Sequence, residues 1–309
     1  MTASSESNKV SICDVGPRDG LQSEKRIWTV DERVEFINRL SRTGLDRIEA
    51  VSFVNPKRVP QMADAESVMA KIDRPDGVRY AGLALNLKGV ERALESGVDE
   101  IRYVVVASET FNQKNQGASI EQSMSAFDGI AETVRAAGKR LSGTIGVTFG
   151  CPFEGEVPLE QVLKIAKRYV DAGVHEIGLA DTIGCAVPNQ ITERVGAVMD
   201  VIGKDIDLTC HFHNTRNTGI ANAAAAVMAG VRLFDASLGG IGGCPFAPRA
   251  TGNIASEDLA YMLRNMGYDT GIDLNALLDV ATWLEGYFPA PLPGQVMKAG
   301  LFPEVAQAS

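Results

Sequence analysis

The sequence lacks the features of a membrane protein, a disulfide-bonded secreted protein and a nucleic-acid-binding protein. No apolar run approaches the roughly 20 residues that a membrane-spanning helix needs. The five cysteines are widely spaced and form no C-x-x-C pair, which argues against a disulfide framework or a cysteine-based zinc finger. Acidic residues outnumber basic ones by 39 to 30, so the basic excess that non-specific nucleic-acid binding requires is missing.

Targeting signals are also absent from the two ends of the sequence. The first ten residues, MTASSESNKV, contain neither an apolar secretory stretch nor an Arg-rich presequence. The last residues, EVAQAS, match no peroxisomal or retention signal. We therefore expect a cytoplasmic protein whose partner is a small molecule, not a nucleic acid or a membrane.

One pattern of helix, glycine and strand recurs four times. In each copy a helical stretch ends at a glycine, which is typical of the position just after a helix. An apolar run follows, as in a buried parallel strand. The copies are residues 43–52, 96–105, 172–181 and 229–238.

Four further strands are predicted between these copies, at residues 10–16, 79–85, 141–149 and 207–213. Eight strands at intervals of about 25 to 40 residues, with helices between them, predict an α/β fold of the (β/α)₈ TIM-barrel type. The alternative is a doubly wound open sheet, which usually has a glycine-rich phosphate-binding turn after its first strand. The turn here is GPRDGLQ, so the barrel is favoured.

The whole chain, residues 1–309, is expected to form one domain, with the barrel over about 10–270. The stretch LNALLDVATWLEGYF predicts an extra helix in a C-terminal extension over about 271–309. The Pro/Gly-rich tail after it is expected to pack on the barrel or on a partner subunit. Because this extension is apolar, we expect a homodimer or a higher homo-oligomer.

Chemically active side chains gather at five predicted strand ends. Active sites of such barrels lie at the C-terminal ends of the strands, so these side chains are expected to converge in the barrel mouth. They are Arg18 and Asp19, Glu49, Asp181, His211 and His213, and Cys244 and Asn253.

His211 and His213 are two residues apart, so on a strand they point to the same face. Two imidazoles with a carboxylate and an amide oxygen suit a divalent metal, and Mg²⁺ or Mn²⁺ is favoured over a structural zinc ion. The alternative is a pair of hydrogen-bonded core histidines. The metal is favoured because the chain has only three histidines and two occupy this strand end.

Cys244 lies in the glycine-rich stretch GGIGGCPF, which predicts a mobile loop carrying a general acid/base or a nucleophile. The alternative is a tight barrel-closing turn with an incidental cysteine. Arg18 is expected to bridge to Glu49, and such a pair would fix its guanidinium as an oxyanion clamp. Asp181 has two interpretations of equal weight, a functional residue and a cap of the helix that follows strand six.

Basic residues are predicted in loops after strands two, three and four, namely Lys57, Arg58, Lys88 and Lys114. Solvated surface lysines are the commoner explanation of such residues. If they share the barrel mouth, they are suited to hold the phosphates of a nucleotide-bearing substrate.

Several motifs resemble the 3-hydroxy-3-methylglutaryl-CoA lyase family, part of a group of metal-dependent barrel lyases and Claisen-type acyltransferases. They are VGPRDGLQSEK, SFVNPKRVPQMAD, NLKG, GCPFEG, DTIG and GGCPFAPRATGNIASED. The resemblance covers about residues 10–270 and implies retro-Claisen cleavage of the acyl-CoA to acetyl-CoA and acetoacetate.

The resemblance also implies site roles. It places Arg18 at the thioester oxygen, with Glu49 supporting it, and Cys244 as the acid/base. It also places Asp181 beside the site. That His211 acts with the metal as the base is our own hypothesis. The implied metal ligands are Asp19, His211, His213 and Asn253. The substrate-binding residues that we predict are Arg18, Ser52, Lys57, Asn86, Lys88 and Arg216.

One stretch departs from the family pattern. The family's H-x-H-D-T-Y-G becomes HFHNTRNTG, with Asn214, Arg216 and Asn217 in place of the acid, the tyrosine and the glycine. The added guanidinium of Arg216 is expected to bind a carboxylate or polar group of the substrate. The substrate is therefore hydroxymethylglutaryl-CoA or a relative such as citramalyl-CoA or another 3-alkyl analogue. An acyltransferase of the same group and a non-catalytic acyl-CoA-binding barrel are the rival functions.

Overall fold

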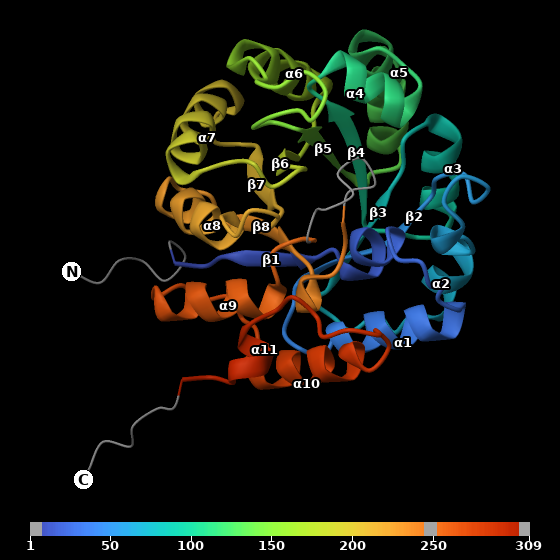
Figure 1. The fold of residues 1–309 in the computed structure, drawn as a ribbon. Helices are drawn as coiled ribbons and strands as arrows, with labels where there is room; N and C mark the ends of the chain where they lie inside the picture. Colours follow the sequence, from blue (N-terminus) through green and yellow to red (C-terminus); the bar gives the residue numbers. More distant parts are fainter. Residues whose placement is uncertain (1–7, 244–251, 303–309) are drawn as a thin grey trace.

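Eight parallel strands form a closed ring in the computed structural model, which describes residues 8–243 and 252–302. Each strand pairs with the next along the chain, and the last pairs with the first (Figure 1). This is the predicted (β/α)₈ barrel. The strands are β1 (Ser11–Asp14), β2 (Arg47–Ser52), β3 (Arg79–Leu83), β4 (Glu100–Val106), β5 (Arg140–Gly146), β6 (Glu176–Asp181), β7 (Asp207–Phe212) and β8 (Leu233–Ala236).

Helices surround the ring and cover its outer face (Figure 1). None of the helices within the described ranges is both long and apolar enough to cross a membrane. The helices are α1 (Val30–Leu40), α2 (Ala65–Lys71), α3 (Leu87–Glu95), α4 (Glu109–Gln116), α5 (Ile120–Ala136), α6 (Leu159–Ala172), α7 (Pro188–Ile202), α8 (Gly219–Met228), α9 (Ser256–Asn265), α10 (Leu274–Glu285) and α11 (Val296–Ala299). Three single turns, η1 (Gly16–Gly20), η2 (Pro60–Met62) and η3 (Leu238–Gly240), complete the described elements.

The recurring glycine has the predicted backbone conformation in all four copies, with a positive φ at Gly44, Gly97, Gly173 and Gly230. Gly173 shows why: at φ 78° it ends α6, and its N–H donates to the carbonyl of Val170. A side chain is disfavoured at this φ, so glycine permits the sharp change from helix to strand.

The C-terminal extension packs on the barrel, as one of the two predicted arrangements requires. The predicted extra helix is α10, which lies beside α1 and α9 (Figure 1). After it, Leu292 is buried, and the N–H of Gly294 donates to the carbonyl of Gly239 at 2.9 Å. The extension thereby braces the segment that follows β8.

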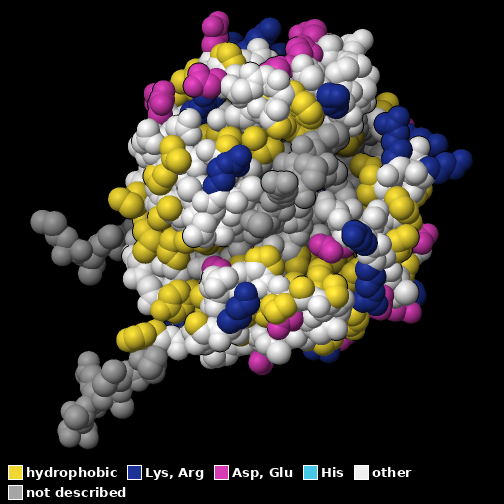
Figure 2. Space-filling view, viewed as in Figure 1, with side chains coloured by type: hydrophobic (Ala, Val, Ile, Leu, Met, Phe, Trp, Pro, Cys, Tyr) yellow, Lys and Arg dark blue, Asp and Glu magenta, His cyan; other side chains and the backbone are white. Residues whose placement is uncertain are grey.

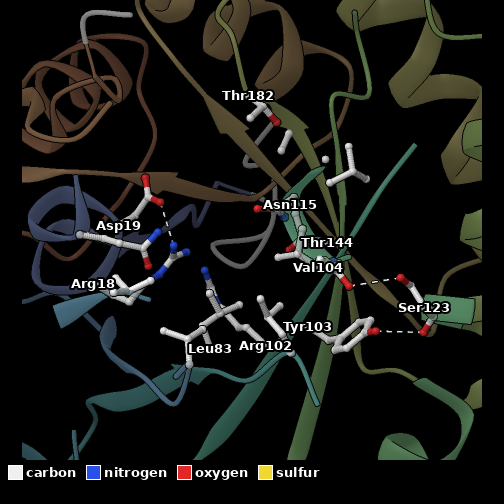
Figure 3. A pocket seen from close by; sticks show the side chains of 18 of the residues that line it. Arg18, Asp19, Leu83, Arg102, Tyr103, Val104, Asn115, Ser123, Thr144 and Thr182 are labelled. Carbon is white, nitrogen blue, oxygen red and sulfur yellow. Dashed lines mark hydrogen bonds and ion pairs between the residues drawn. The ribbon is translucent and has the colours of Figure 1, made fainter. Parts of the chain in front are cut away.

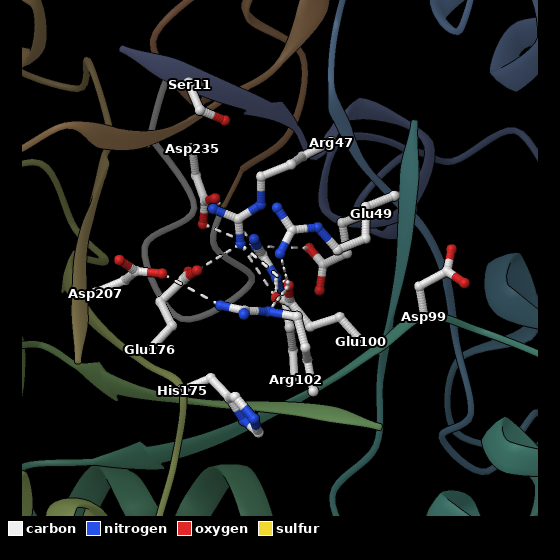
Figure 4. Close-up of polar contacts among 12 residues, drawn as sticks. Ser11, Arg47, Glu49, Asp99, Glu100, Arg102, His175, Glu176, Asp207 and Asp235 are labelled. Atoms are coloured by element: carbon white, nitrogen blue, oxygen red, sulfur yellow. Dashed lines mark hydrogen bonds and ion pairs between the residues drawn. The ribbon is translucent and has the colours of Figure 1, made fainter. Parts of the chain in front are cut away.

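Charged side chains occupy the interior of the ring, where bulky aliphatic residues are usual. Arg47, at the start of β2, lies 2.6 Å from Glu176 and 3.2 Å from Glu100, and all three are buried (Figure 4). A second layer of charges begins with Arg102, which follows Glu100 by two residues on β4. Arg102 lies 3.0 Å from Asp235 and 3.2 Å from Glu100. The interior is therefore ionic from the strand starts up to the mouth.

Candidate active site

The turn η1 places Arg18 and Asp19 in the barrel mouth directly after β1. Its backbone is closely packed: a Cβ atom on Gly16 would lie 2.7 Å from Asp14 Oδ1, and one on Gly20 would lie 2.7 Å from the side chain of Ile241. Real Cβ atoms do not approach neighbours so closely, so the glycines of the GPRDG stretch are what allow this turn to fit.

His211 and His213 lie on one face at the end of β7, as predicted, with their Nε2 atoms 3.2 Å apart. Burial lowers the pKa of His213 to about 4, which keeps its imidazole neutral. Burial acts in the same direction on His211, but the neighbouring Asp235 outweighs it and the pKa of His211 is raised. The Nδ1 atom of His211 lies 3.4 Å from Asp235 Oδ2, which fixes the orientation of the ring.

Asp19 and Asn253 meet across the mouth, from opposite ends of the chain. Asn253 Nδ2 donates to Asp19 Oδ2 at 2.9 Å and to the carbonyl of Ile241 at 3.2 Å. Burial acts to raise the pKa of Asp19, yet Arg18 and the two histidines hold it below its usual value. The carboxyl group is therefore ionised.

These groups fit a divalent metal. Asp19, His211 and His213 each offer one ligand atom, and the three atoms lie within 4.8 Å of one another. Asn253 Oδ1 is buried and has no hydrogen-bond donor among the described residues. A carboxylate, two imidazoles and a free amide oxygen form a donor set that divalent cations accept.

Arg18 is held by two carboxylates, as the predicted bridge to Glu49 requires. Its Nη2 lies 2.7 Å from Glu49 Oε2, and its Nη1 donates to Asp19 Oδ1 at 2.8 Å. Burial acts to lower the pKa of Arg18, but Glu49 and Asp19 outweigh it and raise the pKa. The guanidinium is thus a fixed cation in the mouth (Figure 3).

A cavity of about 580 Å³ opens beside these groups and extends toward α4 and α5. Arg18 and Asp19 lie on one side of the view in Figure 3 and Ser123 lies on the other. His211 and His213 also line the cavity. Leu83 of β3 and Val104 and Val106 of β4 also line it. The cavity has room for an acyl group and part of a longer arm.

Residues 9–284 match the protein family described as HMGL-like. The chain belongs to the HMGL-like family. It is 46% identical over 307 residues to a protein of Chloroflexus aurantiacus named (R)-citramalyl-CoA lyase, with 96% of each chain covered. It is 41% identical over 287 residues to the hydroxymethylglutaryl-CoA lyase YngG of Bacillus subtilis, with 93% of this chain and 96% of that protein covered.

The barrel is also similar to solved structures of named lyases. An HMG-CoA lyase from Acinetobacter baumannii, solved in complex with coenzyme A and 3-methylmalate, superposes with a TM-score of 0.93. That protein is 42% identical to this chain, and all of both chains is covered. The family resemblance seen in the motifs is therefore confirmed over the whole HMGL-like barrel.

Two predicted members of the site are not placed in the cavity. Cys244 lies outside the described residues. Asp181 accepts hydrogen bonds from the backbone N–H groups of Cys185 and Ala186, at 2.9 and 3.0 Å. Both N–H groups belong to the loop before α7, whose N-cap is Val187, so Asp181 fixes that loop and does not cap the helix. Asp181 is not among the described residues that line the cavity.

The predicted substrate-binding residues divide into two groups. Asn86 and Arg58 line the cavity, and Asn86 also caps α3 through the N–H of Gly89. Ser52 is buried at the end of β2, while Lys57 and Lys88 are exposed, and none of these three is among the described lining residues.

The placement of two lysines in loops was wrong. Lys88 lies in α3 and Lys114 in α4, because each helix begins directly after its strand with a capping residue, Asn86 or Ser108. In Figure 2 several Lys and Arg side chains gather on the right-hand side of the molecule, where Figure 1 places α3 and the loop before α2, and others stand apart.

Arg216 has a different environment from the predicted one. It is exposed, and its Nη1 donates to the backbone carbonyls of Ile183 and Gly184 at 3.0 and 2.9 Å. It does not belong to the described residues that line the cavity. Its guanidinium braces the loop after β6 instead of facing the metal ligands.

Sequence reasoning missed two residues at the cavity, Asp235 and Arg102. Both lie inside apolar strand runs, where a charge is costly to bury without a partner. That cost was the available signal: Glu49, Arg102 and Asp235 occupy equivalent positions in three copies of the recurring pattern. Only Glu49 was recognised.

Proposed function

We propose that this protein is a metal-dependent carbon–carbon lyase that cleaves 3-hydroxy-3-methylglutaryl-CoA to acetyl-CoA and acetoacetate. The observation that carries the proposal is the meeting of Asp19, His211 and His213 with Arg18 in one cavity of an HMGL-like barrel. Relatives over nearly the whole chain are named as lyases of this type.

Asp19, His211, His213 and Asn253 would hold the metal, which we propose to be Mg²⁺ or Mn²⁺ because oxygen and imidazole ligands dominate. When bound, the cation supplies Lewis acidity that lowers the pKa of the substrate's 3-hydroxyl group.

Arg18 is the proposed donor to the thioester oxygen. Cleavage of the C2–C3 bond leaves its electron pair on C2, and the charge is delocalised onto that oxygen as an enolate. A guanidinium already fixed by Glu49 needs little rearrangement to stabilise the charge. Loss of such a donor typically costs about 10²–10³ in kcat.

Two proton transfers complete the reaction. The 3-hydroxyl proton leaves to a base, which we propose to be His211 acting with the metal, its ring oriented by Asp235. C3 then becomes the ketone of acetoacetate as the C2–C3 bond breaks. Cys244 is the proposed acid that protonates C2 and gives acetyl-CoA. Closure of its glycine-rich stretch would exclude water meanwhile.

A second substrate is favoured by a specific finding, the 46% identity to a protein named (R)-citramalyl-CoA lyase. Citramalyl-CoA carries its carboxyl group directly on C3, whereas hydroxymethylglutaryl-CoA carries it through one methylene. The same bond cleavage then gives pyruvate in place of acetoacetate. One methylene changes discrimination by only about 10–200-fold, so both substrates suit the same chemistry.

A lyase assay with each CoA ester tests the proposal. Purified protein with Mg²⁺ is expected to release acetyl-CoA and one keto acid, and a chelator is expected to stop the reaction. Acetoacetate identifies the first substrate, and pyruvate the second. Release of free CoA without acetyl-CoA, or full activity in the chelator, would contradict the proposal. The homo-oligomer and the single domain over the whole chain stay predictions.

A further inference from the structure

Arg102 is a buried cation in the cavity that the proposed reaction does not use. It lies in the middle of β4, with a side chain only 5% exposed, and it lines the cavity beside Leu83, Val104 and Thr144. A guanidinium is expensive to bury, so its presence beside the apolar residues of β4 needs a reason.

The guanidinium of Arg102 is held in one orientation by its neighbours. Its Nη1 donates to both carboxylate oxygens of Asp235, at 3.0 and 3.1 Å, and its Nε donates to Glu100 at 3.2 Å. Its Nη2 is buried and has no acceptor among the described residues. Asp235 and Glu100 therefore position the group but leave one of its donors unsatisfied.

A second guanidinium, that of Arg18, lies next to it. Glu49 Oε2 is 2.7 Å from Arg18 Nη2 and 4.0 Å from Arg102 Nη1, so one carboxylate stands between the two cations. Figure 3 shows the two side chains pointing toward each other at the barrel end of the cavity. Arg18 Nε, like Arg102 Nη2, lacks an acceptor among the described residues. Two adjacent guanidinium groups with spare donors favour an anionic ligand.

We infer that Arg102 recognises the distal carboxylate of the acyl chain and is a specificity-determining residue for dicarboxylic acyl-CoA substrates. This inference rests on the proposed function, in which Arg18 takes the thioester oxygen. A carboxylate three or four carbon–carbon bonds from the thioester carbon then reaches the neighbouring guanidinium. Arg102 takes the role that the sequence had suggested for Arg216, from inside the cavity.

The test compares two CoA thioesters that lack the 3-hydroxyl group and so cannot be cleaved. Glutaryl-CoA ends in a carboxylate, and valeryl-CoA has a methyl group in its place. Calorimetry with Mg²⁺ in the buffer gives the Kd of each. For the unaltered protein we expect glutaryl-CoA to bind at least tenfold more tightly. For Arg102→Met we expect the ratio of the two Kd values to fall to about one.

Arg47→Met is the matched control, because Arg47 is equally buried, also pairs with Glu100, and is not among the described lining residues. It is expected to keep the tenfold ratio. Arg102→Lys keeps the charge but not the forked donors, so we expect the ratio of the two Kd values to fall at least threefold. This variant replaces Arg102→Met in the test if Arg102→Met does not fold.

Equal binding of the two thioesters by the unaltered protein would overturn the inference, as would an unchanged ratio in Arg102→Met or Arg102→Lys. The proposed lyase activity fails separately: a protein that selects glutaryl-CoA but cleaves no 3-hydroxyacyl-CoA keeps the Arg102 assignment and loses the reaction.

Discussion

The barrel interior has two charged regions that differ in whether their side chains line the cavity. At the strand starts, Arg47 pairs with Glu100 and Glu176, and these charges compensate one another (Figure 4). In the mouth, Asn253 Oδ1 and His213 Nδ1 are buried without a partner among the described residues. Both regions are ionic and buried, so burial alone does not mark a site. Unpaired polar atoms do not mark it either, since Glu176 Oε1 at the strand starts also lacks a partner among the described residues. The mouth is distinguished by the cavity that its charged side chains line.

The largest expected effect comes from removing a charge in the mouth. Asp19→Ala takes away the carboxylate of the proposed metal set, so tight divalent-metal binding and turnover should both be lost. Metal titration by calorimetry measures the first, and acetyl-CoA release measures the second. Asp207→Ala, which removes an exposed carboxylate at the start of β7, is the control and should change neither. An unaltered metal titration in Asp19→Ala would move the site elsewhere.

Cys244→Ala separates proton transfer from metal binding. Because the cysteine is the proposed acid, turnover should fall by about 10²–10⁴, while metal affinity stays the same. Steady-state kinetics and the metal titration are compared on one preparation. Cys185→Ala provides a control thiol, since Cys185 is not among the described lining residues. Near-normal turnover would remove Cys244 from the mechanism.

At the strand starts, the expected effect is on stability. Arg47→Met leaves Glu176 and Glu100 without their shared cation and should lower the free energy of unfolding by about 3–5 kcal/mol. Metal affinity should be unaffected. Arg42→Met breaks an exposed ion pair with Asp73 and should cost at most about 1 kcal/mol. Urea denaturation compares the two variants. Equal losses would mean that the buried pairs hold the barrel no better than a surface pair does.

A buried carboxylate outside both regions provides the smallest effect. Glu257 has no ion pair to a described side chain, and burial raises its pKa to about 8 from a usual 4.5. The protonated side chain of Glu257 makes its full contribution to the free energy of unfolding below pH 4.5. That contribution is lost as the pH rises through about 8. Glu257→Gln removes that loss, so the variant should be about 2 kcal/mol more stable than the unaltered protein at pH 6.

The advantage of Glu257→Gln should widen up to about pH 8 and vanish near pH 3.5. Unfolding measured at several pH values tests this, and parallel curves for the two proteins would show that Glu257 is ionised in the fold. Compared with the result for Arg47→Met, this measurement shows whether burial or ion pairing decides which carboxyl groups of the barrel interior are ionised.

The sequence predicted the barrel well because its signals are local. In each of the four copies a glycine with positive φ lies between a helix and an apolar strand, and four further apolar runs complete the eight predicted strands. The pair His211 and His213 was equally readable, since two residues on a strand share a face. These predictions depend on short stretches and need no knowledge of distant contacts.

Other parts of the site depend on contacts between strands that a single stretch does not reveal. In the sequence, Arg102 looks like an unpaired charge within an apolar run. Only the fold shows that Asp235, 133 positions away, lies beside it. Arg216 reads as part of the mouth because it follows the histidines closely, yet its side chain turns to the loop after β6. Side-chain direction after a strand end was the information that the sequence lacked.

The hydrogen bond between Asn253 and Asp19 joins residues 234 positions apart, and β1 closes the ring against β8. Contacts between residues so far apart in sequence form slowly, because the chain loses conformational entropy in closing the loop before the contact can stabilise it. During synthesis, the first strand must wait for nearly the whole chain to leave the ribosome before it finds its second neighbour. Asp19 thus emerges early and gains its amide partner only once the ring is complete.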